Sequence, residues 1–186
     1  MKIKQDKLKK VYLDTIPNLL KDSINEKKIS ETLLSNYNGK IAEIIDRYKN
    51  LPAIVVDIGV YTESLKEARQ VYIEGYFYSC IAMCCVTAEK IAKDILIQNL
   101  FIQKDDNFEN IPKEAIKYFE KINLETIREI LIKSNLISGN LRNPYKKLVE
   151  LRNRYMHIRD ITATKSDAIS ALNFLNFIIE DTISLI

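Results

Sequence analysis

Residues that form turns are scarce in this sequence, and this scarcity restricts the fold more than any other feature. Only four glycines and four prolines occur among 186 residues. A β-sandwich or β-barrel connects many short strands and needs far more turn-forming residues than this. The sequence therefore favours long helices with few interruptions.

The segment at residues 76–103 is apolar on most faces of a helix. A helix that is apolar all round belongs at the centre of a bundle. Caps, prolines and apolar stripes predict further helices over residues 40–49, 62–74, 112–122, 125–136, 144–160 and 167–184. Thr62 is the expected N-cap of the helix at residues 62–74.

We predict an all-α fold, with a helical bundle at residues 61–186 and an N-terminal helical extension at residues 1–60. The extension is rich in charged residues, and a turn at Asn36-Tyr37-Asn38-Gly39 is expected to divide it into short helices. The short connections between the other predicted helices are typical of a bundle.

The three cysteines indicate a reducing compartment, and their spacing is not that of metal ligands. Cys80, Cys84 and Cys85 lie close together on one predicted helix, and the only histidine is far away in sequence. We therefore expect reduced thiols in a core, a cytoplasmic protein, and no metal or cofactor. The longest apolar stretch, at residues 80–86, is far too short to cross a bilayer, so no membrane association is expected.

Basic residues gather in two stretches. Residues 1–10 carry five lysines against one aspartate, and residues 142–165 carry seven basic residues against two acidic ones. Such a patch suits a polyanionic partner, although a solvated helix face has the same composition.

The candidate for chemistry lies on the predicted penultimate helix. On a helical wheel with Leu151 at zero, Arg152 lies at ~100°, Asn153 at ~200° and His157 at ~240°. We expect these polar residues on the face opposite the core, with Asn153 and His157 one turn apart.

Two apolar residues fall on the same outward face, Val149 at ~160° and Met156 at ~140°. Apolar side chains there would lie in water unless something covered them. We expect a symmetric partner helix to cover them, which predicts a homodimer with Val149 and Met156 in its interface.

These residue types suit cleavage of RNA. A neutral imidazole can take the proton of a ribose 2′-hydroxyl, and an imidazolium can protonate the leaving oxygen, near neutral pH. A guanidinium matches the non-bridging phosphate oxygens and stabilises developing charge. Arg152, Asn153 and His157 are therefore the candidate catalytic residues, with Asn153 orienting His157 or holding the phosphate.

The pattern Arg152-Asn153-x-x-x-His157 resembles the signature of the HEPN superfamily (higher eukaryotes and prokaryotes nucleotide-binding domain), in which four to six residues separate Arg and His. Upstream, a glycine and an aromatic residue precede an apolar helix with small residues and a glutamate, similar to a second pattern of that family: Gly75, Tyr76, Ala82, Ala88 and Glu89. The resemblance covers about residues 62–186.

The resemblance implies a metal-independent endoribonuclease that works as a dimer, with Arg152 and His157 in a composite cleft and Asn153 supporting them. Many such proteins are toxins of toxin–antitoxin pairs or act in antiviral defence against phage, so RNA and an antitoxin protein are candidate partners. The alternative is a non-catalytic HEPN-like module that binds nucleotide or RNA, or assembles a dimer. Four cations are candidate RNA-binding residues: Lys146, Lys147, Arg154 and Arg159.

Overall fold

The computed structural model describes residues 26–53, 60–104, 107–157 and 162–183. The chain divides into two compact units, Met1–Glu43 and Ile44–Ile186. The sequence predicts a boundary after residue 60, whereas this division falls within a helix that ends at Lys49.

That helix, α3 (Glu26–Lys49), is continuous through Asn36 and Gly39. The predicted turn there is wrong. A glycine inside a helix costs only about 1 kcal/mol relative to alanine, and strong helix formers such as leucine, glutamate and lysine surround it. The predicted helix end just before the Leu51-Pro52 pair is confirmed.

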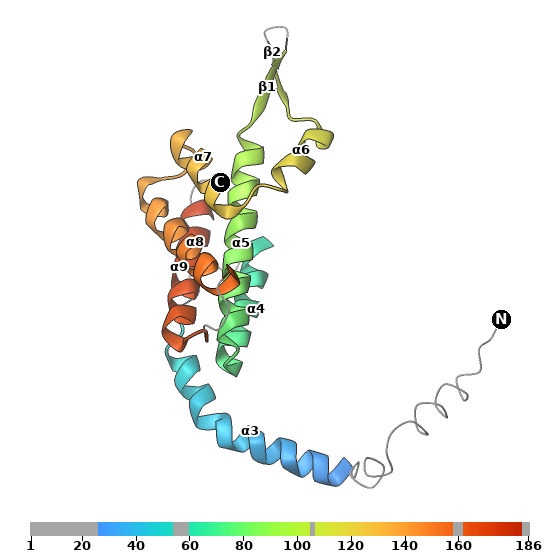
Figure 1. The fold of residues 1–186 in the computed structure, drawn as a ribbon, viewed down its shortest axis with the longest axis vertical. Helices are drawn as coiled ribbons and strands as arrows, with labels where there is room; N and C mark the ends of the chain where they lie inside the picture. Colours follow the sequence, from blue (N-terminus) through green and yellow to red (C-terminus); the bar gives the residue numbers. More distant parts are fainter. Residues whose placement is uncertain (1–25, 54–59, 105–106, 158–161, 184–186) are drawn as a thin grey trace, which may run out of the picture. The chain divides into compact units, whose positions relative to one another are not determined.

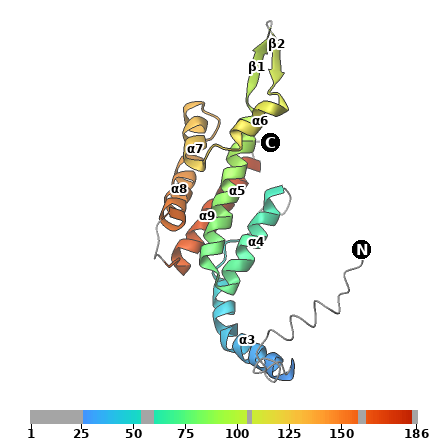
Figure 2. The ribbon, with the colours of Figure 1, turned by 45° about the vertical axis from the view of Figure 1, so that its right-hand side comes forward.

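The unit Ile44–Ile186 is predominantly helical, as predicted for an all-α protein. After α3 its elements follow in the order α4 (Val60–Glu74), α5 (Phe77–Gln98), β1 (Phe101–Lys104), β2 (Asn107–Asn110), α6 (Lys113–Phe119), α7 (Leu124–Lys133), the 3-10 helix η1 (Gly139–Leu141), α8 (Arg142–His157) and α9 (Lys165–Ile183). Helix α5 is central, because α4, α7, α8 and α9 all pack against it (Figures 1 and 2).

The joint between α4 and α5 is Gly75, as the sequence predicts. Its φ of 92° lies in the left-handed region that glycine adopts without strain. Thr62, however, is not an N-cap, because α4 already begins at Val60. Its side chain is 1% exposed and forms part of the packed interior.

Helix α5 ends at Gln98, five residues before the predicted end at Gln103. Residues 101–104 and 107–110 pair as antiparallel strands instead. The Asn99 side-chain amide donates to the carbonyl of Ile95 at 2.8 Å and so occupies a terminal carbonyl of the helix. Phe101 and Ile102, which have high strand propensity, follow directly.

The last two helices are positioned as predicted. Thr164 caps α9, since its hydroxyl accepts the backbone N–H of Asp167 at 3.1 Å. Helix α8 begins at Arg142, two residues before the expected Pro144, and the final residues predicted for it, 158–160, lie outside the described part of the chain. No helix in the described ranges combines the length and apolarity needed to span a bilayer.

Candidate functional site

Helix α8 carries the predicted chemistry, and it is covered over a wide arc. Helices α5, α7 and α9 all pack against it. Its buried side chains therefore extend beyond the single stripe that the helical wheel predicts: Tyr145, Leu148, Val149, Leu151 and Tyr155.

Val149 shows this difference most clearly. The sequence predicts it on an outward face that a partner subunit covers. In the structure Val149 is 6% exposed and belongs to the hydrophobic core of its own chain. The prediction for Val149 is wrong, because the wheel assumes one core direction whereas three helices surround α8. Because Val149 is already covered within its own chain, it does not require a partner subunit to cover it, and it no longer supports the prediction of a dimer.

Arg152 also lies within the covered arc rather than opposite the core. Its side chain is 28% exposed, and its Nη2 atom lies 3.8 Å from Oε2 of Glu89 on α5. That distance is long for an ion pair, so the guanidinium is only loosely held by this carboxylate. Arg152 therefore reaches the surface from a partly buried position at the seam between α5 and α8.

Glu89 is shared between two cations. Its Oε1 atom accepts from Lys93 one turn later on α5 at 2.7 Å, while Oε2 faces Arg152. Lys93 also donates to the backbone carbonyl of Glu120 at 2.7 Å. This small network fixes the carboxylate that faces Arg152. Sequence spacing indicates the Glu89–Lys93 pair, but nothing in the sequence joins Glu89 to Arg152.

The other motif residues are only partly described. Asn153 is exposed and follows Arg152 directly on α8. His157 is the last residue of α8, but the side chains of Met156 and His157 lie outside the described part of the structure, as does all of Arg159. The predicted stacking of His157 above Asn153, and the interface role of Met156, stay predictions.

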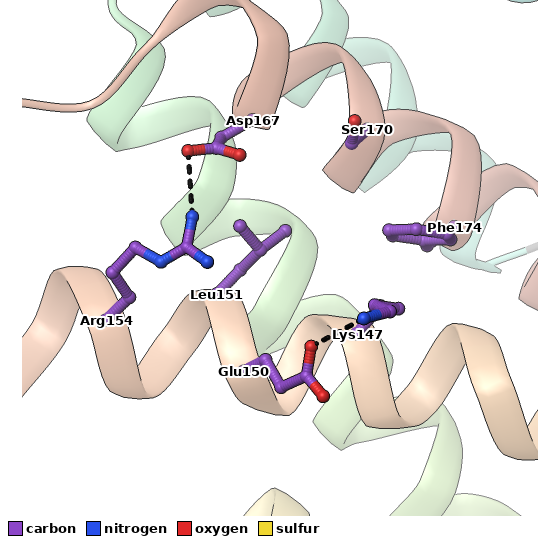
Figure 3. Close-up of a pocket in the computed structure, with 7 residues that line it drawn as sticks. All are labelled: Lys147, Glu150, Leu151, Arg154, Asp167, Ser170 and Phe174. Carbon is purple, nitrogen blue, oxygen red and sulfur yellow. Dashed lines mark hydrogen bonds and ion pairs between the residues drawn. The ribbon is translucent and has the colours of Figure 1, made fainter.

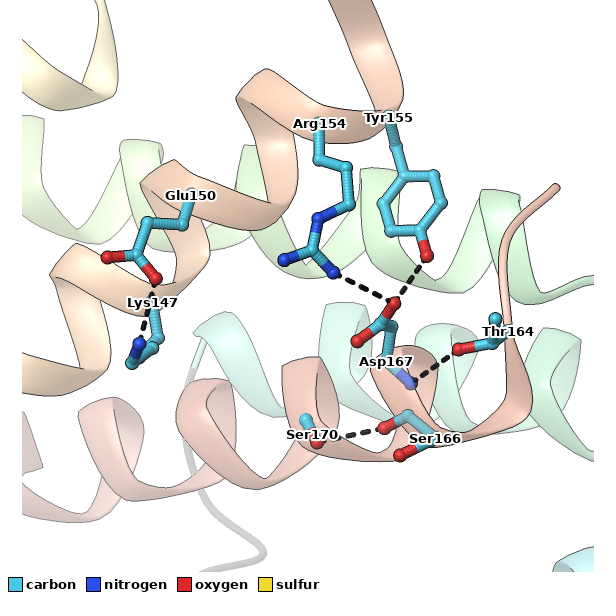
Figure 4. Close-up of polar contacts among 8 residues, drawn as sticks. All are labelled: Lys147, Glu150, Arg154, Tyr155, Thr164, Ser166, Asp167 and Ser170. Atoms are coloured by element: carbon cyan, nitrogen blue, oxygen red, sulfur yellow. Dashed lines mark hydrogen bonds and ion pairs between the residues drawn. The ribbon is translucent and has the colours of Figure 1, made fainter. Parts of the chain in front are cut away.

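Arg154, two residues beyond Arg152, points to a different helix (Figure 4). Its Nη1 atom lies 3.2 Å from Oδ2 of Asp167 at the start of α9. The hydroxyl of Tyr155 donates to the same carboxylate oxygen. Asp167 thus ties the end of α8 to the beginning of α9. The sequence identifies its place in the cap of α9 but not this link between helices.

The predicted RNA-binding lysines are paired within the helix. Lys147 donates to Oε2 of Glu150 at 2.8 Å, and Lys146 lies 3.9 Å from its other oxygen. The hydrogen bond from Lys147, together with the positive charge of both lysines, lowers the pKa of the Glu150 carboxyl. All three side chains are more than 40% exposed, so these pairs are weak and open readily.

A hollow of about 210 Å³ lies between α8 and α9 (Figure 3), lined by Lys147, Glu150, Leu151, Arg154, Asp167, Ser170 and Phe174. It contains two of the predicted RNA-binding cations but neither Arg152 nor Asn153. Its two cations face two carboxylates, so it offers no net charge to an anion. A larger hollow of about 380 Å³ beside α5 and α6 includes Glu89 in its lining.

The cysteines are free and buried, as predicted. The Cys85 thiol lies 3.4 Å from the carbonyl oxygen of Leu148, at the same α5–α8 seam as Arg152. Burial raises the pKa of Cys85 to about 12, although the positive charge of Arg152 opposes that rise. A thiol with such a pKa stays protonated and is a poor nucleophile. Within the described ranges, no three His, Cys, Asp or Glu side chains cluster closely enough to hold a metal ion.

Comparisons of the chain with protein-family models, with curated proteins and with solved structures found no match.

Proposed function

We propose that this protein cleaves RNA without a metal ion, through Arg152, Asn153 and His157 on α8. One observation carries the proposal: Arg152 and Asn153 stand side by side on α8, and Glu89 of α5 contacts the partly exposed guanidinium. A guanidinium in such a position can bind a phosphate while its stem remains packed. The spacing to His157 resembles the HEPN signature.

The chemistry uses a nucleophile that the substrate supplies. The 2′-hydroxyl of a ribose attacks the adjacent phosphorus, and the imidazole of His157 takes its proton or donates one to the departing 5′-oxygen. Arg152 stabilises the charge that develops on the non-bridging oxygens. The bond from phosphorus to the 5′-oxygen breaks, leaving a 2′,3′-cyclic phosphate and a 5′-hydroxyl. Asn153 orients the phosphate or His157.

In this proposal Glu89 positions Arg152. Because the same carboxylate binds Lys93 at 2.7 Å, its place is set before any substrate arrives. A phosphate that bound Arg152 would compete with a contact of 3.8 Å, which is long and therefore weak. The resemblance further suggests a cytoplasmic toxin or antiviral effector that acts as a homodimer and is held in check by an antitoxin protein.

A specific observation favours a second candidate, a non-catalytic module of the same type that binds RNA or nucleotide or assembles a dimer. Arg152 already faces Glu89, Arg154 faces Asp167, and Lys146 and Lys147 face Glu150. Each described cation of the predicted site thus has a carboxylate partner in its own chain. A binding surface tolerates this, since such pairs can open, but catalysis requires Arg152 to be released.

The test is incubation of the full chain with single-stranded RNA in EDTA, beside Arg152→Ala and His157→Ala. We expect the rate of RNA cleavage to be the same with and without EDTA, and to fall about 100-fold or more in both variants. The products should carry 2′,3′-cyclic phosphate ends. Lys133→Ala is the control, because it removes an exposed cation at the end of α7, outside the basic stretch at residues 142–165; its activity should stay within a few-fold of the parent.

Cleavage that survives in His157→Ala, or that requires a divalent cation, would overturn the proposal. RNA binding without cleavage by the folded parent protein supports the module instead. Thermal unfolding of each variant confirms that a loss of cleavage does not come from a loss of fold.

A further inference from the structure

Lys93 is held between α5 and the end of α6. Its Nζ atom donates to Oε1 of Glu89, one turn earlier on α5, and to the backbone carbonyl of Glu120, the residue that ends α6, each at 2.7 Å. The Lys93 side chain is 17% exposed and that of Glu89 is 21% exposed. Water screens such a half-buried pair less than it screens the exposed pairs of Glu150 on α8. Lys93 therefore holds Glu89 firmly.

The Glu89 carboxylate is shared unequally between its two cations. Oε1 lies 2.7 Å from Nζ of Lys93, whereas Oε2 lies 3.8 Å from Nη2 of Arg152. Hydrogen bonds between oppositely charged groups span roughly 2.7–2.9 Å. Only the contact with Lys93 is such a bond, so Glu89 does not occupy the N–H groups of Arg152.

The carboxylate would find a different partner if Lys93 were absent. A guanidinium and a carboxylate that are free to align form two parallel hydrogen bonds, which is the strongest pairing open to either group. Helices α5 and α8 pack against each other, and Glu89 and Arg152 already face each other across that contact. Without Lys93, Glu89 would therefore close on Arg152 and occupy the N–H groups that a phosphate needs.

Direct binding of a phosphate by Lys93 is the less favoured role. An ammonium group has three N–H donors, and two of them are used by Glu89 and by the carbonyl of Glu120. The hollow beside α5 and α6 that Lys93 lines also holds Lys90, Asp94 and Glu120. With Glu89, three carboxylates there face two ammonium groups, so the surroundings of Lys93 repel a phosphate.

We propose that Lys93 is a positioning residue, which keeps Glu89 from closing on Arg152 and so leaves the guanidinium available to a phosphate of the substrate. Lys93 acts through Glu89 and contacts neither the RNA nor the reacting atoms. The inference rests on the proposed function, in which Arg152 binds the phosphate. It adds a residue of α5, anchored to α6, that sets how readily Arg152 on α8 takes up its substrate.

The pairing of Arg152 can be measured without any RNA. In Lys93→Met, which keeps an apolar stem of similar length but removes the charge, exchange of the Arg152 guanidinium protons with water should slow at least about threefold, because they become hydrogen-bonded to Glu89. Lys93→Arg keeps a cation for Glu89 and should restore the rate of the parent. NMR measures both rates, and an unchanged or faster exchange in folded Lys93→Met overturns the proposal.

Kinetics with single-stranded RNA test the consequence for the substrate. Lys93→Met should raise KM about tenfold and change kcat by less than about twofold, because a phosphate that has displaced Glu89 makes the same contacts as in the parent. A merely structural role would lower kcat as well. In a Glu89→Gln background no carboxylate is left to close on Arg152, so adding Lys93→Met should change KM by less than about twofold.

Lys90→Met is the matched control, because Lys90 is an exposed lysine of the same helix that lines the same hollow. Its KM should stay within about twofold of the parent. An equal rise in Lys90→Met, or a full effect of Lys93→Met in the Glu89→Gln background, overturns the proposal in favour of a direct attraction of RNA by charge. A parent protein that neither binds nor cleaves RNA contradicts the proposed function, whereas the exchange of the Arg152 protons still decides whether Lys93 positions Glu89.

Discussion

Arg152 and Arg154 lie two residues apart on α8, yet they belong to different parts of the molecule. Arg152 turns toward α5, is 28% exposed, and meets Glu89 at 3.8 Å. Arg154 turns toward α9, is 49% exposed, and meets Asp167 at 3.2 Å, where Tyr155 also donates. The comparison shows that a basic run in sequence is not one surface, because residues two apart on a helix point in nearly opposite directions, ~160° from each other.

The two sides of α8 also differ in what their contacts achieve. On the α9 side, Asp167 holds two donors and joins consecutive helices, which is a structural task. On the α5 side, the contact of Arg152 is long and its carboxylate is already satisfied by Lys93. We therefore infer that the contacts on the α9 side mainly stabilise the fold, and that Arg152 on the α5 side is the residue available for the proposed function. The following four experiments test this assignment.

The largest effect is expected from Val149→Asp. Val149 is 6% exposed in the core, and burial of a carboxylate there is costly, so we expect a loss of about 3–5 kcal/mol in the free energy of unfolding. Urea denaturation measures it. Asn153→Asp is the control on an exposed position of the same helix and should change stability by less than about 0.5 kcal/mol. A stable Val149→Asp variant with impaired dimerisation would restore the predicted interface.

Alkaline pH should lower the free energy of unfolding next, through two buried thiols of α5. Burial raises the pKa of Cys84 well above its ordinary value and that of Cys85 to about 12. Both thiols stay protonated in the folded state but ionise in the unfolded chain near pH 8.5, roughly. Unfolding therefore releases protons, and stability is complete below that pH and falls above it.

The expected loss between pH 9 and pH 10 is about 1 kcal/mol for Cys85, and the raised pKa of Cys84 acts in the same direction. Urea denaturation at both pH values measures it, before tyrosines in the unfolded chain ionise fully. Cys85→Ala should remove about 1 kcal/mol of this loss. A stability that does not change over this interval would mean that the thiols are accessible to water.

Removal of the carboxylate at Asp167 tests the α9 side. In Asp167→Ala the hydroxyl of Tyr155, a residue that is 5% exposed, loses its acceptor, and we expect a loss of about 1–2 kcal/mol in unfolding free energy. Tyr155→Phe removes the donor instead and should cost less. If Asp167→Ala left stability intact but abolished RNA cleavage, the assignment of the two sides would be reversed.

The smallest effects on stability are expected from Arg152→Ala and Lys147→Ala. Lys147 is 46% exposed and its pair with Glu150 contributes below about 0.5 kcal/mol. Arg152→Ala should lower the unfolding free energy by less than about 1 kcal/mol. A larger loss, measured by thermal unfolding, would show that Arg152 is a structural residue like Arg154.

Much of the fold follows from local sequence signals. The scarcity of glycine and proline predicts the helices, Gly75 marks the joint before α5, and Thr164 marks the start of α9. The predictions that are wrong concern segments in which the preference of a few residues is overridden by that of the residues beside them. Asn36 to Gly39 read as a turn but continue a helix, and the apolar run through Gln103 reads as a helix but becomes a strand after Gln98.

The candidate site divides in the same way. The residue types and spacing of Arg152, Asn153 and His157 can be read from the chain, because α8 is a regular helix and chemistry depends on side-chain type. What surrounds α8 cannot be read in this manner. Its three packing partners are separate helices: α7 and α9 are its neighbours along the chain, and α5 is distant in sequence. Together they bury Val149 and bring Glu89 to Arg152.

Local sequence signals therefore establish that the protein is helical, where most of its helices lie, and which residues are candidates for chemistry. The tertiary structure alone decided which of these side chains are covered, which carboxylate each cation meets, and that β1 and β2 contact no other described helix or strand. Helix formation depends on residues within one or two turns of each other, whereas burial and ion pairing depend on contacts between segments that only the folded chain brings together.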